Sequence, residues 1–569
     1  MNICSLEAIT TIAVAALAFQ LLPGAGLRRL GLVLLNGAFL WWVVPSADAL
    51  VVLGLFVVAT YALVRGVAVW TSAAFVAAAI TLVSVAFSAL KEYSVYVTLS
   101  LAAASLVATA LAVRPARPGL GGFLLGLVAA GCVALVLPRL HVSGYVRGAL
   151  AQVPGYVHAL VERVAAAPHW LSHGPPADPG RPPDPLALIG LSYMFFKFIH
   201  VLVDRWQGQL EKVPFVTYAN YQLGLFTLIA GPIQRFGDFQ RFWDTMEPAA
   251  PHPADTVRGW SRLLGGVLKM GVLAPLVLTR FTAAGAGLAA GPANPFPDFA
   301  VVYYGYPIYL FLNFSGYTDI AIGCGRLVGL TLPENFNYPF LGRNVTDFWD
   351  RWHMSLTSWI RDYVFMTSYK AAVERYPARA RLIGYGLVFL SLFVAGIWHG
   401  ADKRYMAYGV VFGLGAVASH VYGDVLKAGL GRARFKAYQQ NALARCAAVL
   451  LTFHFTCFAM LFFSSGVAPA LAILGQVGAR AWAWSPAVDP RAALYVLVPL
   501  AVLGLCALGQ RRAFVAALGD RWRGRADSNA LVLYGRVVCA TVFLALFYII
   551  SSSSLKTHVE APVVVYMRF

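Results

Sequence analysis

The sequence predicts an all-α polytopic membrane protein, and two observations lead to that fold class. Of the 569 residues, 59% are hydrophobic and only 12% are charged, whereas soluble domains carry about 25% charged residues. In addition, mostly apolar runs of the length that crosses a bilayer as a helix recur along the chain, and the mean hydropathy is +0.68. The clearest runs are residues 47–64, 68–89, 92–113, 119–137, 404–423, 443–463, 491–508 and 531–550.

Polarity changes along the chain and predicts four parts. Residues 1–137 form a nearly continuous set of apolar helices, and the first run, about 7–22, lacks the basic flank of a cleavable signal peptide. Residues 138–187 contain "HGPPADPGRPPDP", which is too rich in Pro and Gly for a helix and predicts a surface loop. Residues 188–530 combine apolar helices with unusually many polar and aromatic residues, and residues 531–569 supply a last helix and a tail.

The charge balance of +19 would suggest a nucleic-acid partner in a soluble protein. Here the basic residues gather in loops between apolar runs, where they set membrane orientation, so we expect no nucleic acid. The seven cysteines show no CxxC or metal-ligand spacing, so we expect neither a disulfide framework nor a metal site. They are Cys4, Cys132, Cys324, Cys446, Cys457, Cys506 and Cys539.

Basic loops also predict the orientation of the chain. The segment "QRRAFVAALGDRWRGR", residues 510–525, is rich in arginine and is expected in the cytoplasm. The C-terminus is then extracytoplasmic, and the apolar segment 383–397 rises from the cytoplasmic side towards His399. At 1.5 Å per residue that segment reaches about 22 Å, short of a hydrocarbon core of about 30 Å. We therefore expect His399 within the depth of the membrane, in its outer half.

The densest polar stretch is "NFNYPFLGRNVTDFWDRWHMSLTSWIRDYVF", residues 335–365. A helix over 346–364 would place His353 at the border of an apolar stripe, one turn from Asp350. One interpretation is an amphipathic helix in which His353 is a hydrogen-bonded packing residue. The other is a functional cavity, because ionisable residues are costly inside a membrane protein. The stripe consists of Trp349, Trp352, Leu356, Trp359, Ile360 and Tyr363.

A second histidine lies in "GIWHGADKRYMAYG", residues 396–409, where His399 follows Trp398. A low-dielectric setting favours the neutral form of histidine, which can act as a general base. A single histidine at a helix end is often structural. Two histidines in polar segments that must pack inside one membrane bundle favour the functional interpretation.

These two stretches together resemble the membrane-bound O-acyltransferase family, in particular its bacterial DltB and AlgI branches. The resemblance covers residues 190–465 and includes "LIAGPIQRF" (228–236) and "FLNFSGYTDIAIGCGRLVG" (311–329). It implies a ring of tilted transmembrane helices around a central tunnel. An acyl thioester enters this tunnel from the cytoplasm and a hydroxyl acceptor enters from outside.

The resemblance also implies roles for individual residues. His399 matches the catalytic histidine of the family and His353 matches its second signature histidine. We expect the supporting or tunnel-lining residues to be Trp398, Asp350, Trp352 and Asn335, with the aromatic groups excluding water.

The C-terminal "VVYMRF" resembles the end of DltX, a single-helix protein of DltB systems whose pattern is close to FxYxxF. Val564, Tyr566 and Phe569 occupy the matching positions, and the chain departs from the pattern at Val564. The resemblance implies that Tyr566 receives the acyl group. A phenol of pKa about 10 gives an ester that stays activated. The alternative is a tail that is disordered or packed on the outer surface.

The resulting hypothesis is an acyltransferase in the inner membrane of a bacterium that moves D-alanine or a similar small acyl group to an envelope polymer. The expected donor is a phosphopantetheine thioester on a DltC-like acyl carrier protein at the cytoplasmic face, with no bound cofactor. A DltD-like extracytoplasmic partner and membrane lipids complete the expected partners. The alternatives are a polysaccharide O-acetyltransferase of the AlgI type, a transporter or flippase without acyl chemistry, and a scaffold for an envelope complex.

Overall fold

Helices form almost all of the regular structure of the chain. In the part of the chain that the computed structural model describes, no strand forms and the single extended contact is an isolated bridge between Phe336 and Trp352. The prediction of an all-α protein is confirmed. The described residues are 6–44, 47–90, 190–246, 253–400, 402–480, 494–495 and 497–502.

Five helices among the described residues are long and apolar enough to cross a membrane. The chain is a multi-pass membrane protein, as the apolar runs predicted. The five helices are Ala49–Gly66, Asp255–Ala289, Pro377–Ile397, Lys403–Gln440 and Ala442–Ser465. The predicted runs at 92–113, 119–137 and 531–550, most of 491–508 and the polar segment 138–187 lie outside the described residues.

The apolar helix before His399 is longer than the sequence predicted. The candidate span Pro377–Ile397 has 21 residues, which corresponds to about 31 Å and is enough to cross a hydrocarbon core. Its first turn includes Arg379 and Arg381, which broke the apolar run when only hydropathy was counted. The premise that this segment is too short to cross the membrane is therefore wrong, and the depth of His399 in the membrane stays a prediction.

The chain divides into two compact units. Unit 1 contains Leu17–Pro248 and Trp359–Leu387. Its elements are α2 (Ala25–Val43), α3 (Ala47–Gly66), α4 (Ala73–Leu90), α9 (Leu191–Trp206), α10 (Phe215–Gln222), α11 (Phe236–Asp244), the π-helix η5 (Arg361–Phe365), α17 (Met366–Arg375) and the 3₁₀-helix η6 (Pro377–Arg379). Three helices contribute residues to both units: α1 (Leu6–Leu21), α16 (Met354–Ile360) and α18 (Ala380–Ile397).

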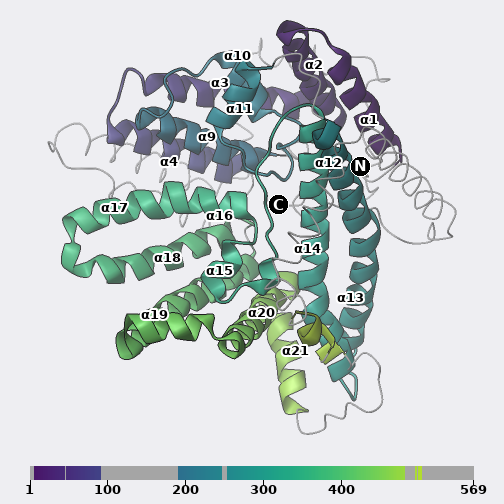
Figure 1. The fold of residues 1–569 in the computed structure, drawn as a ribbon, viewed down its shortest axis with the longest axis vertical. Coiled ribbons are helices and arrows are strands. Elements are labelled where there is room, and N and C mark those ends of the chain that lie inside the picture. The colour runs from purple at the N-terminus through teal and green to yellow at the C-terminus, as the bar shows by residue number, and fades with distance from the viewer. Residues whose placement is uncertain are drawn as a thin grey trace, which may run out of the picture. The chain divides into compact units, whose positions relative to one another are not determined.

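Helix α9 is the centre of unit 1. It is buried on every face from Leu191 to Asp204, and it packs against α3 and α4 (Figure 1). Phe195 stacks on Phe87 of α4, with 4.6 Å between ring centroids. A helix that is buried on all sides must be surrounded by other elements, so α9 is a core element.

Unit 2 contains Ala249–Ser358 and the chain from Val388 onward. Its elements are α12 (Pro253–Leu268), the π-helix η3 (Lys269–Leu273), α13 (Ala274–Ala289), α14 (Phe296–Leu327), the 3₁₀-helix η4 (Pro339–Leu341), α15 (Val345–Trp349), α19 (Lys403–Gln440), α20 (Ala442–Ser465) and α21 (Val467–Ala479).

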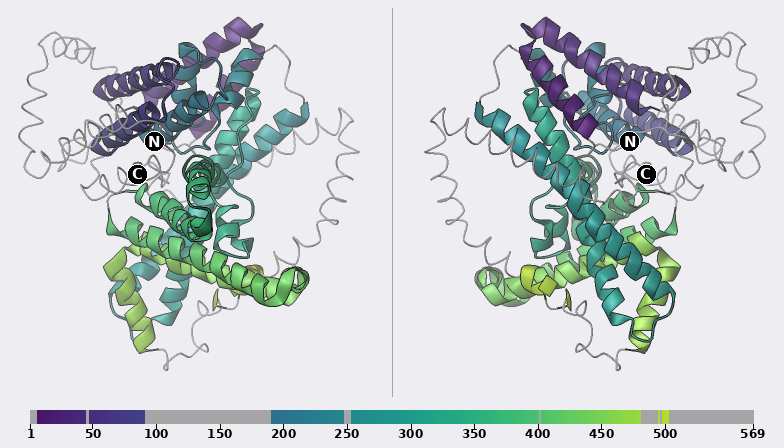
Figure 2. Two further views of the ribbon diagram at one scale, coloured as in Figure 1. Left: turned by 90° about the vertical axis from the view of Figure 1, so that its left-hand side faces the viewer. Right: turned by 90° about the vertical axis from the view of Figure 1, so that its right-hand side faces the viewer.

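Helices α12 and α14 of unit 2 run side by side at very short range (Figures 1 and 2). A Cβ atom on Gly316 would lie 2.9 Å from the carbonyl oxygen of Gly266, and one on Gly323 would lie 2.7 Å from that of Gly259. Small residues at such contacts let helix backbones approach closely, which is a common way of joining helices in membranes. This pair forms the rigid frame to which the loop before His353 is attached.

Candidate active site

His399 follows the last turn of α18 in a buried cluster of aromatic side chains in unit 2. Its side chain is 4% exposed, and the imidazole lies edge-to-face with Phe463 of α20, with 5.1 Å between centroids. Tyr405 and Tyr408 of α19 lie at centroid distances of 5.9 and 6.1 Å. Aromatic groups from two long helices therefore surround this histidine.

Glycines bring α18 and α19 together beside His399. A Cβ atom on Gly396 would lie 2.6 Å from the Cα atom of Gly409 and 2.7 Å from the carbonyl oxygen of Tyr405. Only glycine permits such a backbone contact. The sequence "GIWHG" thus places Trp398 and His399 directly against the start of α19.

His353 lies at a break in the chain and not inside a continuous helix. The predicted helix over 346–364 is divided into α15, ending at Trp349, and α16, beginning at Met354. His353 adopts a left-handed backbone conformation with φ of 45°, which costs about 1 kcal/mol or more for a residue other than glycine. The prediction of one unbroken helix is wrong, because residues 335–337 pair with residues 351–354 and stop it. The amide of Asn337 donates to the Arg351 carbonyl at 3.0 Å.

Trp398 connects the two histidines. Its indole lies 4.8 Å from the ring centroid of His399 and 6.4 Å from that of His353. His353 is 1% exposed and also contacts the Phe314 ring edge-to-face at 4.7 Å. The structure therefore brings together three predicted site residues from two separate segments of the sequence.

Both histidines lie outside the five candidate spanning helices, and burial keeps both neutral. Desolvation, with a smaller contribution from His399, lowers the pKa of His353 to about 3. Desolvation lowers the pKa of His399 to about 3. At neutral pH each imidazole therefore has a lone pair that can accept a proton.

The other predicted site residues have different surroundings. Asn335 is fully buried, and its oxygen atoms accept hydrogen bonds from the amides of Met354 and Ser355. Trp352 is 1% exposed and packs among phenylalanines, including Phe336. Asp350 is exposed at the end of α15. The tail residues Tyr566 and Phe569 lie outside the described residues.

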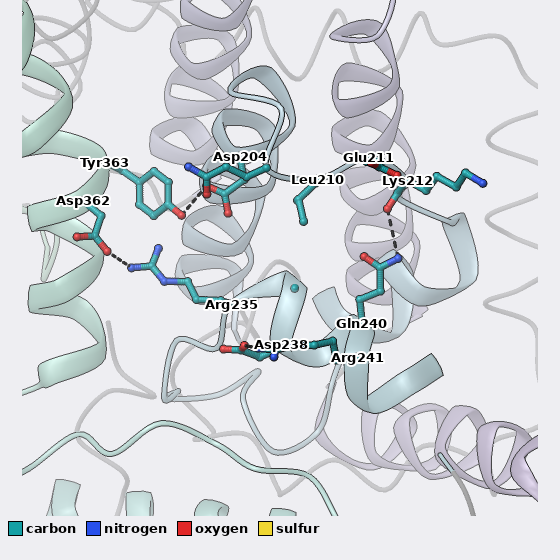
Figure 3. A pocket seen from close by; sticks show the side chains of 12 residues that line it. Asp204, Leu210, Glu211, Lys212, Arg235, Asp238, Gln240, Arg241, Asp362 and Tyr363 are labelled. Atoms are coloured by element: carbon teal, nitrogen blue, oxygen red, sulfur yellow. Dashed lines mark hydrogen bonds and ion pairs between the residues drawn. The ribbon is translucent and has the colours of Figure 1, made fainter. Parts of the chain in front are cut away.

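A pocket of about 680 Å³ lies within unit 1 (Figure 3). On one wall the guanidinium of Arg235 pairs with Asp362 at 2.6 Å and lies over the ring of Tyr363 at 4.7 Å. The Tyr363 hydroxyl donates to Asp204 at 2.7 Å. Asp362 and Tyr363 come from the π-helix η5. The π-helix is rare in proteins, and where it occurs it is often at a functional site.

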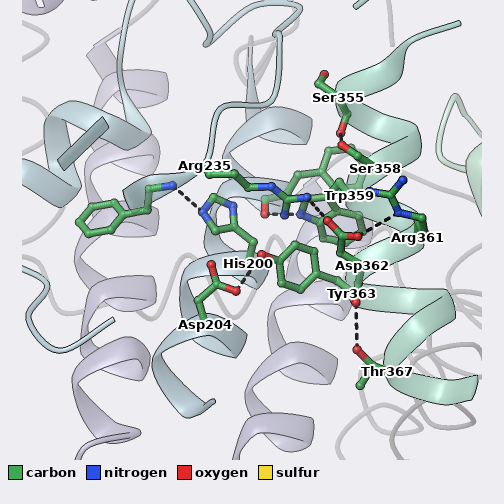
Figure 4. A network of polar contacts seen from close by, with 12 residues as sticks. His200, Asp204, Arg235, Ser355, Ser358, Trp359, Arg361, Asp362, Tyr363 and Thr367 are labelled. Atoms are coloured by element: carbon green, nitrogen blue, oxygen red, sulfur yellow. Dashed lines mark hydrogen bonds and ion pairs between the residues drawn. The ribbon is translucent and has the colours of Figure 1, made fainter. Parts of the chain in front are cut away.

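Buried polar contacts hold the backbone that carries Arg235 (Figure 4). The Nε2 atom of His200 accepts a hydrogen bond from the Phe236 amide at 2.9 Å. The Tyr221 hydroxyl donates to the Gln234 carbonyl at 2.6 Å. Because these bonds flank Arg235 on both sides, the start of α11 and the cation next to it are held against α9 and α10.

The sequence analysis did not select Arg235, Asp362, Tyr363 or Asp204 as site residues. A signal was present, since Arg235 belongs to the "LIAGPIQRF" segment and ionisable residues are rare in this chain. The pairing itself could not be read from the sequence, because Arg235 and Asp362 are far apart along the chain.

Within the described ranges no group of three or more His, Cys, Asp or Glu side chains is arranged to hold a metal ion. Among the described residues, the buried cysteines Cys324 and Cys457 are free thiols. The chemistry that the residues themselves offer is proton transfer by two buried, neutral imidazoles.

The fold and this site define a polytopic helical membrane protein with a buried pair of histidines suited to proton transfer. The model of the membrane-bound O-acyltransferase family matches residues 191–465. The "Teichoic acid D-alanyltransferase" of Bacillus subtilis (strain 168) is 31% identical over 354 residues, which cover 59% of this chain and 85% of that protein. The chain belongs to the membrane-bound O-acyltransferase family and is an acyltransferase.

Two further relatives represent both branches of the resemblance. The "Teichoic acid D-alanyltransferase" of Streptococcus thermophilus is 27% identical over 296 residues, covering 49% of this chain and 68% of that protein. The "Probable alginate O-acetylase AlgI" of Pseudomonas fluorescens is 31% identical over 229 residues, covering 40% of this chain and 43% of that protein. The similarity to these two D-alanyltransferases extends over more of the chain than the similarity to this O-acetylase.

Proposed function

We propose that the chain transfers D-alanine, or a similar small acyl group, from a cytoplasmic carrier-protein thioester to a hydroxyl acceptor, and that His399 is the general base. The observation that carries this proposal is the buried arrangement of His399, Trp398 and His353, in which both imidazoles are neutral. The longer match to relatives named teichoic acid D-alanyltransferases supports the choice of acyl group.

The proposed step requires one proton to move from the acceptor to the leaving group. The hydroxyl oxygen attacks the thioester carbonyl while His399 takes the hydroxyl proton. The C–S bond then breaks, a C–O ester bond forms, and the imidazolium returns the proton to the thiolate. Burial lowers the pKa of His399, so the resting imidazole is neutral, which is the form that a general base requires.

The proposed donor and partners are those that the resemblance to the DltB branch implies. A phosphopantetheine thioester on a DltC-like carrier supplies the acyl group at the cytoplasmic face of the inner membrane. An envelope polymer of the teichoic acid type, served by a DltD-like extracytoplasmic partner, takes it up. An ammonium group added to such a polymer reduces its negative charge and its attraction for cationic peptides.

Tyr566 is the proposed first acceptor, in an extracytoplasmic tail. A phenyl ester keeps much of the transfer potential of the thioester, because phenoxide leaves more readily than an aliphatic alkoxide. The tail supplies Tyr566 within "VVYMRF", and its resemblance to the DltX ending supports this relay.

Peptide mass spectrometry after incubation with D-alanyl-loaded carrier tests the proposal. The expected result is a D-alanyl increment on the C-terminal peptide of the wild type, absent in Tyr566→Phe and in His399→Ala. Tyr376→Phe, which removes an exposed tyrosine hydroxyl elsewhere, should leave the increment unchanged. An active wild type with an unmodified tail would contradict the relay and indicate direct transfer to the polymer.

A second candidate function is O-acetylation of a polysaccharide, which the match to the alginate O-acetylase AlgI favours. In that case an acetyl thioester would be the better donor and Tyr566→Phe would have wild-type activity. Parallel assays with acetyl and D-alanyl thioesters on the same carrier separate the two functions.

A further inference from the structure

Helix α16 begins immediately after His353, which takes the position of its N-terminal cap. The carbonyl oxygen of His353 accepts hydrogen bonds from the amides of Leu356 and Thr357, both at 3.0 Å. At a cap position the side chain is usually Ser, Thr, Asp or Asn, whose oxygen accepts from an amide of the first turn. The histidine side chain does not play this part here, so the buried amides of Met354 and Ser355 in the first turn need another acceptor.

Asn335, from a different segment, supplies the missing acceptors. Its backbone carbonyl accepts from the Met354 amide at 2.9 Å, and its side-chain Oδ1 accepts from the Ser355 amide at 3.2 Å. Asn335 is fully buried. The two amides that follow His353 are thus satisfied by one residue, which performs the usual task of the cap side chain.

Because Asn335 supplies these acceptors, the His353 imidazole is not used for capping and packs against aromatic rings. The ring lies against Phe314 and Trp398, and its backbone is held at a φ of 45°. A residue other than glycine stays in this region only where its surroundings fix it. The hydrogen bonds to Asn335 act on the two residues that follow this strained position.

Ion pairs anchor the segment that carries Asn335. Arg262 of α12 pairs with Glu334, the residue before Asn335, and also with Asp319 of α14. Lys269, at the start of the π-helix η3, pairs with Asp319 at 2.6 Å. The acceptor is therefore tied to the α12–α14 frame of unit 2.

We propose that Asn335 is a positioning residue that caps α16 in place of His353 and thereby fixes the His353 ring beside Trp398. The inference rests on the proposed function, because it assigns His353 a part in acyl transfer. Asn335 acts through His353 and does not contact the acyl group.

Steady-state transfer of D-alanine from loaded carrier tests this in a double-mutant cycle of Asn335→Ala with His353→Ala. A mispositioned catalytic group costs up to about 100-fold. We expect Asn335→Ala to lower kcat about 10-fold to 100-fold with KM for the carrier nearly unchanged. In the His353→Ala background the same substitution should cause no further loss, because residues that act as a unit are non-additive.

Two further variants separate positioning from folding. Asn335→Asp keeps an oxygen acceptor for the Ser355 amide and should recover most of kcat, since the Thr318 hydroxyl, 3.5 Å from the Asn335 amide, can donate to it. Asn441→Ala removes an exposed asparagine cap, at the start of α20, where Oδ1 accepts from the Ala444 amide at 3.0 Å. That control should lower thermal stability and leave kcat unchanged.

Full activity of Asn335→Ala, or an equal loss in the His353→Ala background, would overturn the positioning role alone. Wild-type transfer by His353→Ala would overturn both this role and the part of His353 in the proposed function. Recovery by Asn335→Asp with non-additive losses would support the inference.

Discussion

The indole of Trp398 lies beside the imidazole of His353, with 6.4 Å between ring centroids and 65° between ring planes. This contact joins two polar segments that an apolar helix separates in the sequence. His399, at 4.8 Å on the same indole, completes a buried cluster. Its aromatic walls exclude water, which is the property that the proposed thioester chemistry needs to favour transfer over hydrolysis.

Replacing Trp398 should therefore change the fate of the donor. Trp398→Leu leaves a space between the two histidines that water can enter, so we expect slower acyl transfer and faster thioester hydrolysis. The measurement is the ratio of free acyl group to acylated acceptor. Trp243→Leu, which removes a buried tryptophan in unit 1, should lower stability by a similar amount without changing this ratio. An equal change in both variants would contradict the assignment.

The stability of the protein should depend on pH through the two histidines. Each has a pKa of about 3 in the folded chain and about 6.5 when exposed, so between these values the unfolded state binds protons that the folded state does not. Stability is therefore present above about pH 6.5 and is lost as pH falls towards about pH 3, by at most about 1.4 kcal/mol per pH unit for each histidine. Thermal unfolding midpoints of His353→Gln/His399→Gln should fall less steeply on acidification than those of the wild type. Parallel pH profiles would contradict the burial of neutral imidazoles.

The contact between α18 and α19 should not tolerate a side chain at Gly396. Gly396→Ala places a Cβ atom 2.6 Å from the Gly409 Cα atom, and we expect a loss of about 1–3 kcal/mol in stability together with reduced transfer. Gly386→Ala, on the same helix, meets no atom within 4 Å. It should be neutral or stabilising by up to about 1 kcal/mol, because alanine favours helix. Equal unfolding midpoints for the two variants would show that α18 and α19 do not meet as described.

The pair Arg235–Asp362 should stabilise unit 1 only modestly. The two side chains are 26% and 40% exposed, so solvent screening limits the interaction, and we expect a coupling energy of about 1 kcal/mol in a cycle of Arg235→Ala and Asp362→Ala. The exposed pair Arg241–Asp238, with 79% and 51% exposure, is the matched control and should give less. Couplings that are equal in the two cycles would argue against a structural role of Arg235 at the pocket.

The fold class could be predicted from the sequence, whereas the roles of the selected site residues stay predictions. Apolar runs at 404–423 and 443–463 identified α19 and α20, although α19 extends well beyond its apolar part. His353, Trp398 and His399 were selected from their polar setting and from the family resemblance. Features of this kind can be predicted because each depends only on residue type and spacing along the chain.

Other features depend on contacts between distant residues and could not be predicted. The periodicity of residues 346–364 fits a helix, yet pairing of Phe336 with Trp352 interrupts it. The capping of α16 by Asn335 and the pairing of Arg235 with Asp362 likewise require the three-dimensional arrangement. The apolar run before His399 was also shorter than the span Pro377–Ile397, because Arg379 and Arg381 near its start are not apolar.

The most direct test of the central claim is the single-turnover rate at which purified protein removes the D-alanyl group from loaded carrier and delivers it as an ester. The account predicts that His399→Ala lowers this rate by about 100-fold or more. His454→Ala changes a different histidine, which lies on α20 and packs against Tyr303, and should retain the wild-type rate. Undiminished transfer by folded His399→Ala would contradict the account.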